Sequence, residues 1–327
     1  MILAGDIGGT HARLAFFDVL NGRYSLVTSS VFPSREYAGL DQIVTQFVDA
    51  SPAHPTLACF GIAGPVTNGR VETSNLPWVI ESKRLAAELN INQALLINDL
   101  EATAWGIGAL SPSDVVALNE VKGQPIGNQA VIAAGTGLGE AGMYWDGVNH
   151  HVFASEGGHG DFAPQNDLEV ELFRYLHARF GHVSYERILS GPGLVNVYHF
   201  LRDTNRGTEP KWLLEEMLHS DPAAVISKAA LAGTCPLSEH TLDLFISVYG
   251  AEAGNLALKY KATGGVFLAG GIAPKLLPKL TSSLFMKAFL DKGRMQHLME
   301  SMPVSVITND SLALLGAARC AMVKSAS

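Results

Sequence analysis

The chain has 327 residues, 47% of them hydrophobic and 17% charged, with 33 glycines and 15 prolines. This composition is enough for two globular cores, and the glycines show no triplet period, which excludes collagen-like and low-complexity chains. The charge balance of 23 Lys+Arg against 31 Asp+Glu gives −8. Because no basic stripe or tail offsets this negative charge, we expect no nucleic-acid partner.

The cysteines and the opening segment indicate the compartment. Cys59, Cys235 and Cys320 are widely spaced and form no Cys-x-x-Cys pair, so we interpret them as reduced thiols. The opening MILAGDIGGT lacks a basic stretch followed by an apolar core, and no run of about 18 apolar residues occurs. We therefore expect a cytoplasmic protein that does not act at a membrane.

The first part of the chain predicts a strand–glycine turn–strand opening followed by alternating strands and helices. Apolar periodicity predicts strands at 2–4, 12–18, 24–32, 57–63 and 94–97, and helices at 40–48, 82–89 and 100–110. The segment 111–127 is polar and contains proline and glycine, which indicates the crossing into a second domain.

The strand–glycine turn–strand pattern of the first part recurs after residue 127. We predict strands at 130–134, 141–145, 151–154, 266–269 and 304–307, a helix capped by residues 165–167, helices over 211–262, and a last helix at 311–323. The repeated opening indicates a duplication whose halves face a cleft. We therefore expect an α/β protein with domains at 1–110 plus 308–327 and at 111–307, the second enlarged by a helical insertion.

The first glycine turn has the composition of a phosphate-binding segment. It consists of Gly5, Asp6, Ile7, Gly8, Gly9 and Thr10. Its glycines allow close backbone approach, and its carboxylate suits a polyphosphate with Mg²⁺. A tight hairpin also requires glycine, so the turn alone leaves both interpretations open.

The second glycine turn, Gly135-Thr136-Gly137-Leu138-Gly139, extends to Gly142 and so also matches a dinucleotide-binding fingerprint. That fingerprint requires a helix to begin at the turn. Residues 141–147 instead predict a strand and a turn, which favours a hairpin.

Several polar segments are candidate binding or catalytic sites. Asn98-Asp99 follows a buried strand, where α/β proteins present functional side chains, although either residue also suits a helix cap. Glu156 and His159 lie in a glycine-rich loop that indicates ligand binding, and a metal-binding His159 is disfavoured because no second His follows at helical spacing. Glu186 is either a solvated residue or a cleft residue. Gly270-Gly271 would let a purine or ribose lie against backbone.

Six segments, in this order along nearly the whole chain, resemble those of bacterial glucokinases. They are GDIGGTHARL at 5–14, IND at 97–99, GTGLG at 135–139, EGGH at 156–159, SGPGL at 190–194 and LAGGI at 268–272. The resemblance implies the sugar-kinase/Hsp70/actin superfamily, with two ribonuclease-H-like domains around an ATP-binding cleft. A cysteine-rich zinc motif of related kinases is absent, so the resemblance is to the zinc-free type, without a helix-turn-helix regulator.

The resemblance implies a role for each candidate segment. Glucose would bind to Asn98, Asp99, Glu156, His159 and Glu186. The residues that bind ATP would be Gly5, Asp6, Ile7, Gly8, Gly9, Thr10, Gly135, Thr136 and Gly137 for its phosphates and Gly270 and Gly271 for its adenosine. The family also implies a homodimer.

The chemistry of the residues is consistent with these roles. A sugar hydroxyl ionises far above neutral pH, so a carboxylate must accept its proton, and Asp99 is the candidate general base. Asp6 would hold Mg²⁺ through water. The expected reaction is ATP-dependent phosphorylation of D-glucose to glucose 6-phosphate, the entry to glycolysis. The alternatives are a kinase for mannose or an N-acetyl amino sugar, and an actin- or chaperone-like nucleotide switch.

Overall fold

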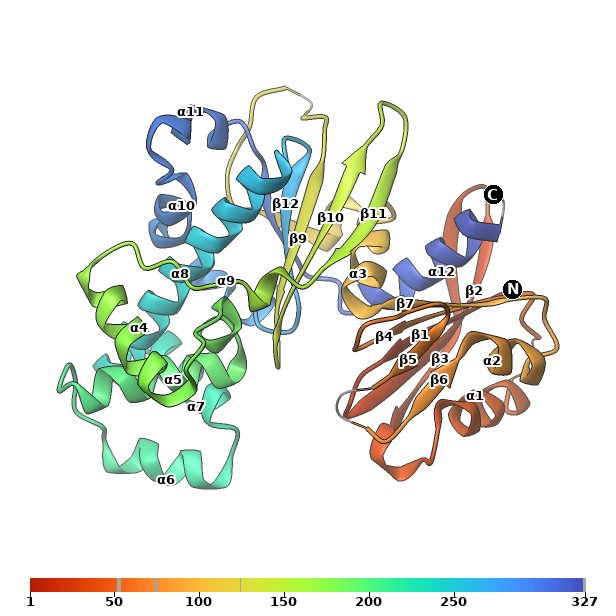
Figure 1. Cartoon of the computed structure of the whole chain (residues 1–327), viewed down its shortest axis with the longest axis horizontal. Helices are drawn as coiled ribbons and strands as arrows, with labels where there is room; N and C mark the ends of the chain where they lie inside the picture. Colours follow the sequence, from red (N-terminus) through yellow and green to blue (C-terminus); the bar gives the residue numbers. More distant parts are fainter. Residues whose placement is uncertain (52–53, 74–75, 124, 326–327) are drawn as a thin grey trace. The chain divides into compact units, whose positions relative to one another are not determined.

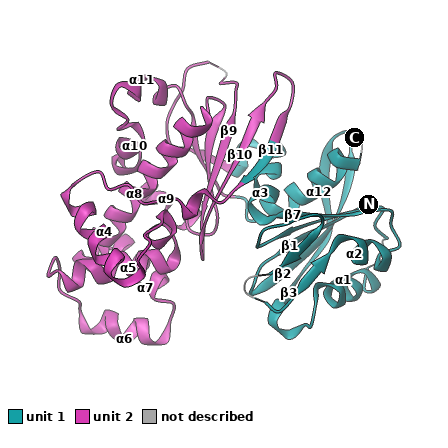
Figure 2. Cartoon of the chain, in the orientation of Figure 1, with its two compact units in different colours: residues 1–114, 152–154, 309–327 teal, residues 115–151, 155–308 magenta. Residues whose placement is uncertain are grey.

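The computed structural model of the chain describes residues 1–51, 54–73, 76–123 and 125–325. The chain forms two compact units (Figure 2). Unit 1 comprises 1–114, 152–154 and 309–327, and unit 2 comprises 115–151 and 155–308. The expected division into 1–110 plus 308–327 and 111–307 stays a prediction, and residues 52, 53, 74, 75, 124, 326 and 327 within it lie outside the described residues.

Unit 1 is built on a five-stranded sheet in the order β3-β2-β1-β4-β7 (Figure 1). Its strands are β1 (Ile2–Ile7), β2 (His11–Leu20), β3 (Arg23–Pro33), β4 (Leu57–Ile62) and β7 (Ala94–Asn98). The first three strands are antiparallel neighbours, whereas β1, β4 and β7 run parallel. The parallel strands therefore end at one edge, where the first glycine turn and Asn98 lie.

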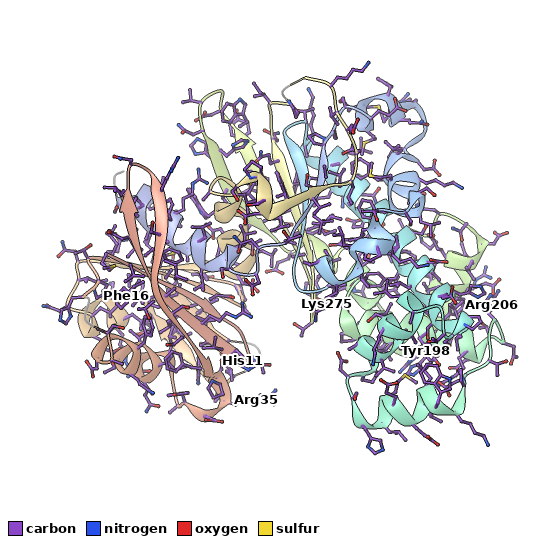
Figure 3. All side chains as sticks on the ribbon, turned by 180° about the vertical axis from the view of Figure 1, so that it is seen from behind. His11, Phe16, Arg35, Tyr198, Arg206 and Lys275 are labelled. Carbon is purple, nitrogen blue, oxygen red and sulfur yellow. The ribbon has the colours of Figure 1, made fainter. Side chains whose placement is uncertain are left out.

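Successive apolar side chains along the strands of unit 1 point to opposite sides of the sheet, so both faces of the sheet are apolar. Leu3 packs with α1 (Leu40–Asp49) and α2 (Ser82–Glu88). Ile2 and Ala4 point the other way, into a cluster with α3 (Asp99–Ile107) and α12 (Leu312–Ser325). Helices on both faces make unit 1 a three-layer α/β/α structure, with Phe16 fully buried in it (Figures 1 and 3).

Unit 2 repeats this topology. Its sheet has the order β11-β10-β9-β12-β13-β8, and its first five strands correspond in order to those of unit 1. The strands are β9 (Gln129–Ala134), β10 (Leu138–Trp145), β11 (His150–Ser155), β12 (Gly265–Ala269), β13 (Val304–Ile307) and β8 (Val115–Ala117). Strands β9 and β10 form an antiparallel hairpin. The predicted duplication is confirmed, and the hairpin excludes the dinucleotide-binding interpretation, which needs a helix there.

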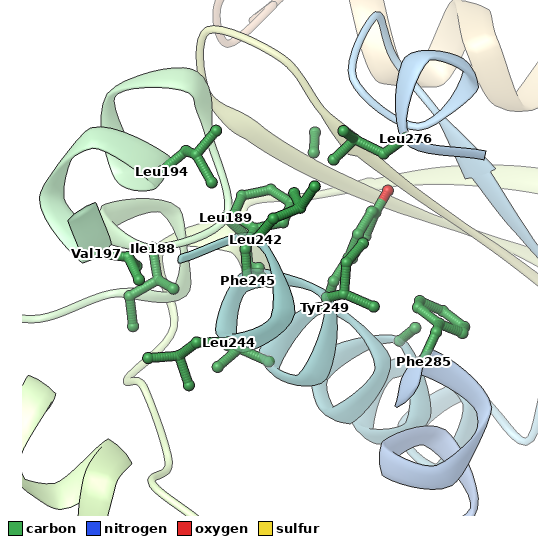
Figure 4. Packing of buried hydrophobic residues seen from close by; sticks show 14 of the residues in the cluster. Ile188, Leu189, Leu194, Val197, Leu242, Leu244, Phe245, Tyr249, Leu276 and Phe285 are labelled. Atoms are coloured by element: carbon green, nitrogen blue, oxygen red, sulfur yellow. The ribbon is translucent and has the colours of Figure 1, made fainter. Parts of the chain in front are cut away.

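Helices enlarge unit 2, as predicted. They are α4 (Asp167–Phe180), α5 (Gly191–Asp203), α6 (Lys211–His219), α7 (Pro222–Leu231), α8 (Pro236–Tyr260), α9 (Leu277–Leu280), α10 (Ser283–Leu290) and α11 (Gln296–Met299). The long helix α8 runs through the core, where Phe245 and Tyr249 are fully buried and Tyr249 contacts Phe285 edge to face (Figure 4). Tyr198 of α5 is also fully buried (Figure 3). No helix among the described residues is both long and apolar enough to span a membrane.

The structure differs from the sequence predictions in a few elements. Strand β8 lies in the segment 111–127, which we interpret as the crossing into a second domain and in which we predict no strand. The hairpin of β5 (Arg70–Glu72) and β6 (Val79–Glu81) and the helix α5 are not predicted. Helix α3 begins at Asp99 and not at residue 100, because the side chain of Asn98 accepts a hydrogen bond from the Leu100 N–H and caps the helix.

The end of α3 is held by α12, and this contact gives a test of the fold of unit 1. Arg319 Nη1 donates to the Trp105 carbonyl oxygen at 2.9 Å, and its guanidinium lies 5.7 Å from the centre of the Trp105 ring. We expect Arg319→Ala to lower the free energy of unfolding by about 1.5 to 3 kcal/mol, since it removes a charged donor from a helix C-terminus. Urea denaturation of the purified protein measures this.

Lys324→Ala is the matched control for Arg319→Ala. Lys324 is a cation on the same helix, but its bond to Glu101 is 3.5 Å long and its side chain is 44% exposed. We expect a change below about 0.5 kcal/mol. Equal effects of the two substitutions would contradict the anchoring role of Arg319.

Candidate active site

The first glycine turn joins β1 to β2 and closes as a hairpin. The Gly8 N–H donates to the His11 carbonyl oxygen at 3.0 Å. The Ser34 side chain also stabilises the turn, because its hydroxyl donates to the Gly8 carbonyl oxygen at 2.8 Å. A small pocket beside the turn is lined by Ile7, Gly8, Gly9, Ala63, Thr73 and Leu76. The hairpin geometry is thus confirmed, and it also presents glycine backbone to a pocket.

Asp6 supplies a carboxylate just before this turn. It pairs in register with Arg13 of β2, and burial raises the pKa of the Asp6 carboxyl while the Arg13 charge lowers it. Among the described residues no three His, Cys, Asp or Glu side chains gather in a metal-binding group. A single carboxylate fits Mg²⁺ that takes its other oxygens from phosphates and water.

Asn98 and Asp99 lie where β7 passes into α3. Asn98 donates from Nδ2 to the Gly64 carbonyl oxygen at 3.2 Å, and the Oδ1 atoms of both residues accept from the Leu100 N–H at 2.9 Å. The cap predicted as an alternative for this pair is therefore present at Asn98. Asp99 lies in the first helical turn, where the helix dipole favours a carboxylate.

Gly61 of β4 brings Asp99 close to the end of β1. A Cβ atom at Gly61 would lie 3.7 Å from both the Asp99 Cα and the Gly5 carbonyl oxygen, and only 2.7 Å from the Ala102 Cβ. Unit 1 thus gathers the first glycine turn, Asp6, Asn98 and Asp99 along the carboxyl edge of β1, β4 and β7.

The second glycine turn joins β9 to β10 and is held by Glu186. The Gly135 N–H donates to the Gly137 carbonyl oxygen at 2.8 Å, and the Leu138 N–H donates to Glu186 Oε2 at 3.0 Å. Glu186 lies in the 3₁₀ turn η4 (Tyr185–Arg187). Its Oε1 is 4.0 Å from His159 Nδ1. One carboxylate therefore contacts both the glycine turn and His159.

The glycine-rich loop forms the 3₁₀ turn η3 (Gly157–His159), in which the His159 N–H donates to the Glu156 carbonyl oxygen at 3.0 Å. A Cβ atom at Gly158 would collide with the Leu138 carbonyl oxygen, so the loop reaches the second glycine turn only because residue 158 is glycine. Glu156 and His159 are exposed, His159 to 61%. The loop therefore presents both polar side chains to solvent beside the half-buried Glu186.

Gly270 and Gly271 follow β12 and lie next to the same turn. Gly270 has φ +82°, and a Cβ atom there would meet the Ala134 carbonyl oxygen at the end of β9. The Ile272 N–H donates to that same oxygen at 3.3 Å. Unit 2 thus brings together the second glycine turn, Glu156, His159, Glu186 and the Gly270-Gly271 pair.

Ser190 opens the SGPGL segment, but the sequence reasoning gave this residue no role in the site. Its hydroxyl donates to the Glu186 carbonyl oxygen at 2.8 Å and accepts from the Gly193 N–H at 3.0 Å, so it joins the Glu186 turn to the start of α5. The Gly191 N–H also donates to the Gly135 carbonyl oxygen at 2.8 Å. A serine directly before Gly-Pro-Gly is a helix N-cap pattern, and that signal could have located it.

A family model described as Glucokinase matches residues 3–324. The chain belongs to the glucokinase family. It is 43% identical to a glucokinase of Nostoc sp. and 44% identical to one of Trichormus variabilis, in both cases over 98% of each chain. Among solved structures, a glucokinase from an Antarctic psychrotroph has 33% identity and a TM-score of 0.86, covering 98% of both chains.

Membership of the glucokinase family agrees with the two α/β units. The shared strand order of the two sheets is that of the actin-like two-domain fold, as the resemblance implied. Four of the six glucokinase motifs fall at the carboxyl ends of β1, β7, β9 and β12, the EGGH motif follows β11, and the SGPGL motif begins α5.

The bond between Glu186 and the Leu138 N–H can be tested without any ligand. We expect Glu186→Ala to speed hydrogen exchange at the Leu138 amide by roughly tenfold or more, since a hydrogen bond to a charged acceptor is lost. Exchange followed by NMR measures this. Glu156→Ala is the control and should leave Leu138 unchanged, because Glu156 is exposed on the neighbouring loop. The same exchange rate in all three proteins would contradict the assignment.

Proposed function

We propose that this chain transfers the γ-phosphoryl group of ATP to the 6-hydroxyl of D-glucose, with Asp99 as the general base. The observation that carries the proposal is the position of Asp99 in the first turn of α3, at the carboxyl end of β7, in a chain that matches the glucokinase family over 3–324. In α/β folds, reactive and ligand-binding groups lie at the carboxyl ends of the sheet strands.

In the proposed reaction, Asp99 accepts the proton of the sugar hydroxyl as the bond from O6 to the γ-phosphorus forms. The bond from that phosphorus to the bridging oxygen breaks, and ADP leaves. A carboxylate is needed because the hydroxyl proton is not acidic at neutral pH. The bond from the Leu100 N–H to Asp99 Oδ1 and the helix dipole both favour the ionised form of Asp99.

The sugar would be held by hydrogen bonds to the side chains of the candidate residues Asn98, Asp99, Glu156, His159 and Glu186. Charged acceptors bind hydroxyl groups more strongly than neutral ones do. The clustering of Glu186 and His159, 4.0 Å apart, supports their assignment to one ligand.

The nucleotide would use the glycine segments. Backbone N–H groups at Gly5–Thr10 and Gly135–Gly137 would face the phosphates, and Gly270-Gly271 would accommodate the adenosine. Asp6 would hold Mg²⁺ through water; when bound, this ion neutralises charge on the transferring phosphate. Its position before the glycine turn and its partly buried carboxylate support this role.

We further propose a cytoplasmic homodimer that provides glucose 6-phosphate at the entry to glycolysis and uses neither nucleic acid nor a membrane as a partner. The net charge of −8 supports the lack of a nucleic-acid partner.

A coupled assay of ADP release with a panel of sugars tests the proposed substrate. We expect glucose to support the highest kcat/KM, followed at a distance by mannose and the N-acetyl amino sugars, with little ADP release when sugar is omitted. A preference for another hexose would reassign the substrate. ATP hydrolysis that no sugar stimulates would favour a nucleotide switch.

Asp99→Asn tests the general base. Asn retains an oxygen that accepts from the Leu100 N–H, so we expect folding and the binding of ATP and glucose to persist while kcat falls by roughly 10² to 10⁴. Glu156→Ala is the contrast, because it should raise the KM for glucose and leave the KM for ATP unchanged. Turnover of Asp99→Asn within a few-fold of the parent would leave Asp99 with a structural role only.

A further inference from the structure

Two carboxyl groups meet in the interior of unit 2. Glu140 on β10 is 1% exposed, and Glu252 on α8 is fully buried. Glu252 accepts hydrogen bonds from Asn255 Nδ2 at 2.8 Å and from Lys259 Nζ at 3.3 Å. Glu140 Oε1 receives no N–H or O–H bond from the described residues. The Glu140 carboxyl has that of Glu252 as a neighbour, whose charge adds to burial in raising the pKa of Glu140.

Two carboxyl groups in contact in a dry interior bind one proton between them, because two adjacent negative charges there repel strongly. Burial and the neighbouring Glu252 raise the pKa of Glu140 to about 8. Lys259 and Asn255 both donate to Glu252, whereas Glu140 Oε1 accepts no hydrogen bond from the described residues. At neutral pH the raised pKa of Glu140 keeps one proton within the pair.

The remaining ionisable groups around the pair are two tyrosines and a lysine. Tyr185 of η4 and Tyr249 of α8 face the carboxyl groups, and burial raises the pKa of each hydroxyl far above neutral pH. Lys292, which lies between α10 and the 3₁₀ turn η6 (Gly293–Met295), is near Glu252, and burial lowers its pKa. Both tyrosines stay neutral near pH 8, so Glu140→Gln is the substitution that separates the titration of the carboxyl pair from that of Lys292.

The pair lies directly beneath the loop that carries Glu156 and His159. A Cβ atom at Gly157 would collide with Glu140 Oε2, so the loop backbone rests on this carboxyl group. The pair also reaches the Glu186 turn, because Asn255 Nδ2 donates both to Glu252 and to the Tyr185 hydroxyl oxygen, the latter at 3.0 Å. Both segments with sugar-binding candidates in unit 2 are thus supported from below by one carboxyl pair.

We propose that Glu140 and Glu252 are positioning residues, a proton-sharing pair that fixes the loop Gly157–His159 and the turn Tyr185–Arg187 so that Glu156, His159 and Glu186 face the sugar. The consequence for glucose rests on the proposed function, whereas the ordering of the two segments does not. Loss of the shared proton places two charges beneath Gly157, and the loop above them loosens.

The direction of the pH effect follows from the raised pKa. The pair favours the folded protein most at low pH, and this contribution declines as pH rises from the ordinary carboxyl range towards 8. Glu140→Gln removes the titration but keeps a neutral N–H donor of the same shape toward Glu252. As the pH rises from 5 to 8.5, the midpoint temperature of thermal unfolding should therefore decrease more in the parent than in Glu140→Gln.

Amide hydrogen exchange without ligand is the primary readout, expressed as protection factors at residues 157–160 and 185–187. We expect the parent to lose protection several-fold between pH 7 and 9.5, and Glu140→Gln to retain it.

In steady-state kinetics, the KM for glucose of the parent should rise over this range more than that of Glu140→Gln, with similar kcat and ATP KM in both. Glu140→Ala, which leaves a void beneath Gly157, should lower protection and raise the glucose KM at every pH.

Glu169→Gln is the matched control, because Glu169 is a buried glutamate of the same unit that accepts from Gln165 and Asn166 at the start of α4. It should keep the pH profile of the parent. Superimposable protection profiles for the parent and Glu140→Gln would overturn the proposal. Protection that follows the prediction in a protein without glucose kinase activity would overturn the proposed function and leave the positioning role standing.

Discussion

Close packing of backbone against backbone at the carboxyl end of β9 is the constraint on which the site in unit 2 depends. Gly270 meets the Ala134 carbonyl oxygen, and Gly158 meets that of Leu138. A side chain at either glycine would push its segment outward by the width of a methyl group or more. These segments carry the candidate adenosine site and the loop with Glu156 and His159, so the backbone contact places both around the glycine turn.

The two units share a sheet topology but carry different chemistry at the same edge. In unit 1 Asp6 lies near the end of β1, and the side chains of Asn98 and Asp99 at the end of β7 are held by hydrogen bonds with backbone groups. In unit 2 the equivalent edge ends in glycine, and the carboxylates come from later turns. In the duplicated scaffold, the proposed general base thus lies at a helix terminus, whereas the proposed sugar acceptors of unit 2 lie on loops and turns.

Periodicity and glycine placement predicted most strands, the duplication, the β9–β10 hairpin and the cap before α4, because these depend on neighbours in sequence. Strand β8 was missed because three partly exposed residues after Pro112 have no buried alternation. The bond from Leu138 to Glu186 and the meeting of Glu140 with Glu252 were not predictable. Each depends on how β10 packs against segments far along the chain, and a glutamate in an apolar strand gives no signal of its partner.

Glu186 shows why the candidate sugar and phosphate segments of unit 2 cannot be treated as independent. Its Oε2 fixes the Leu138 N–H in the glycine turn, while its Oε1 faces His159. In the proposed site, a sugar hydroxyl bound to Oε1 restrains the whole carboxylate, and the turn is then held more firmly. By thermodynamic reciprocity, phosphates that order the turn also favour the carboxylate orientation that binds sugar. Because Ser190 and the carboxyl pair both hold the Glu186 turn, this coupling is part of the packed core and not of an isolated loop.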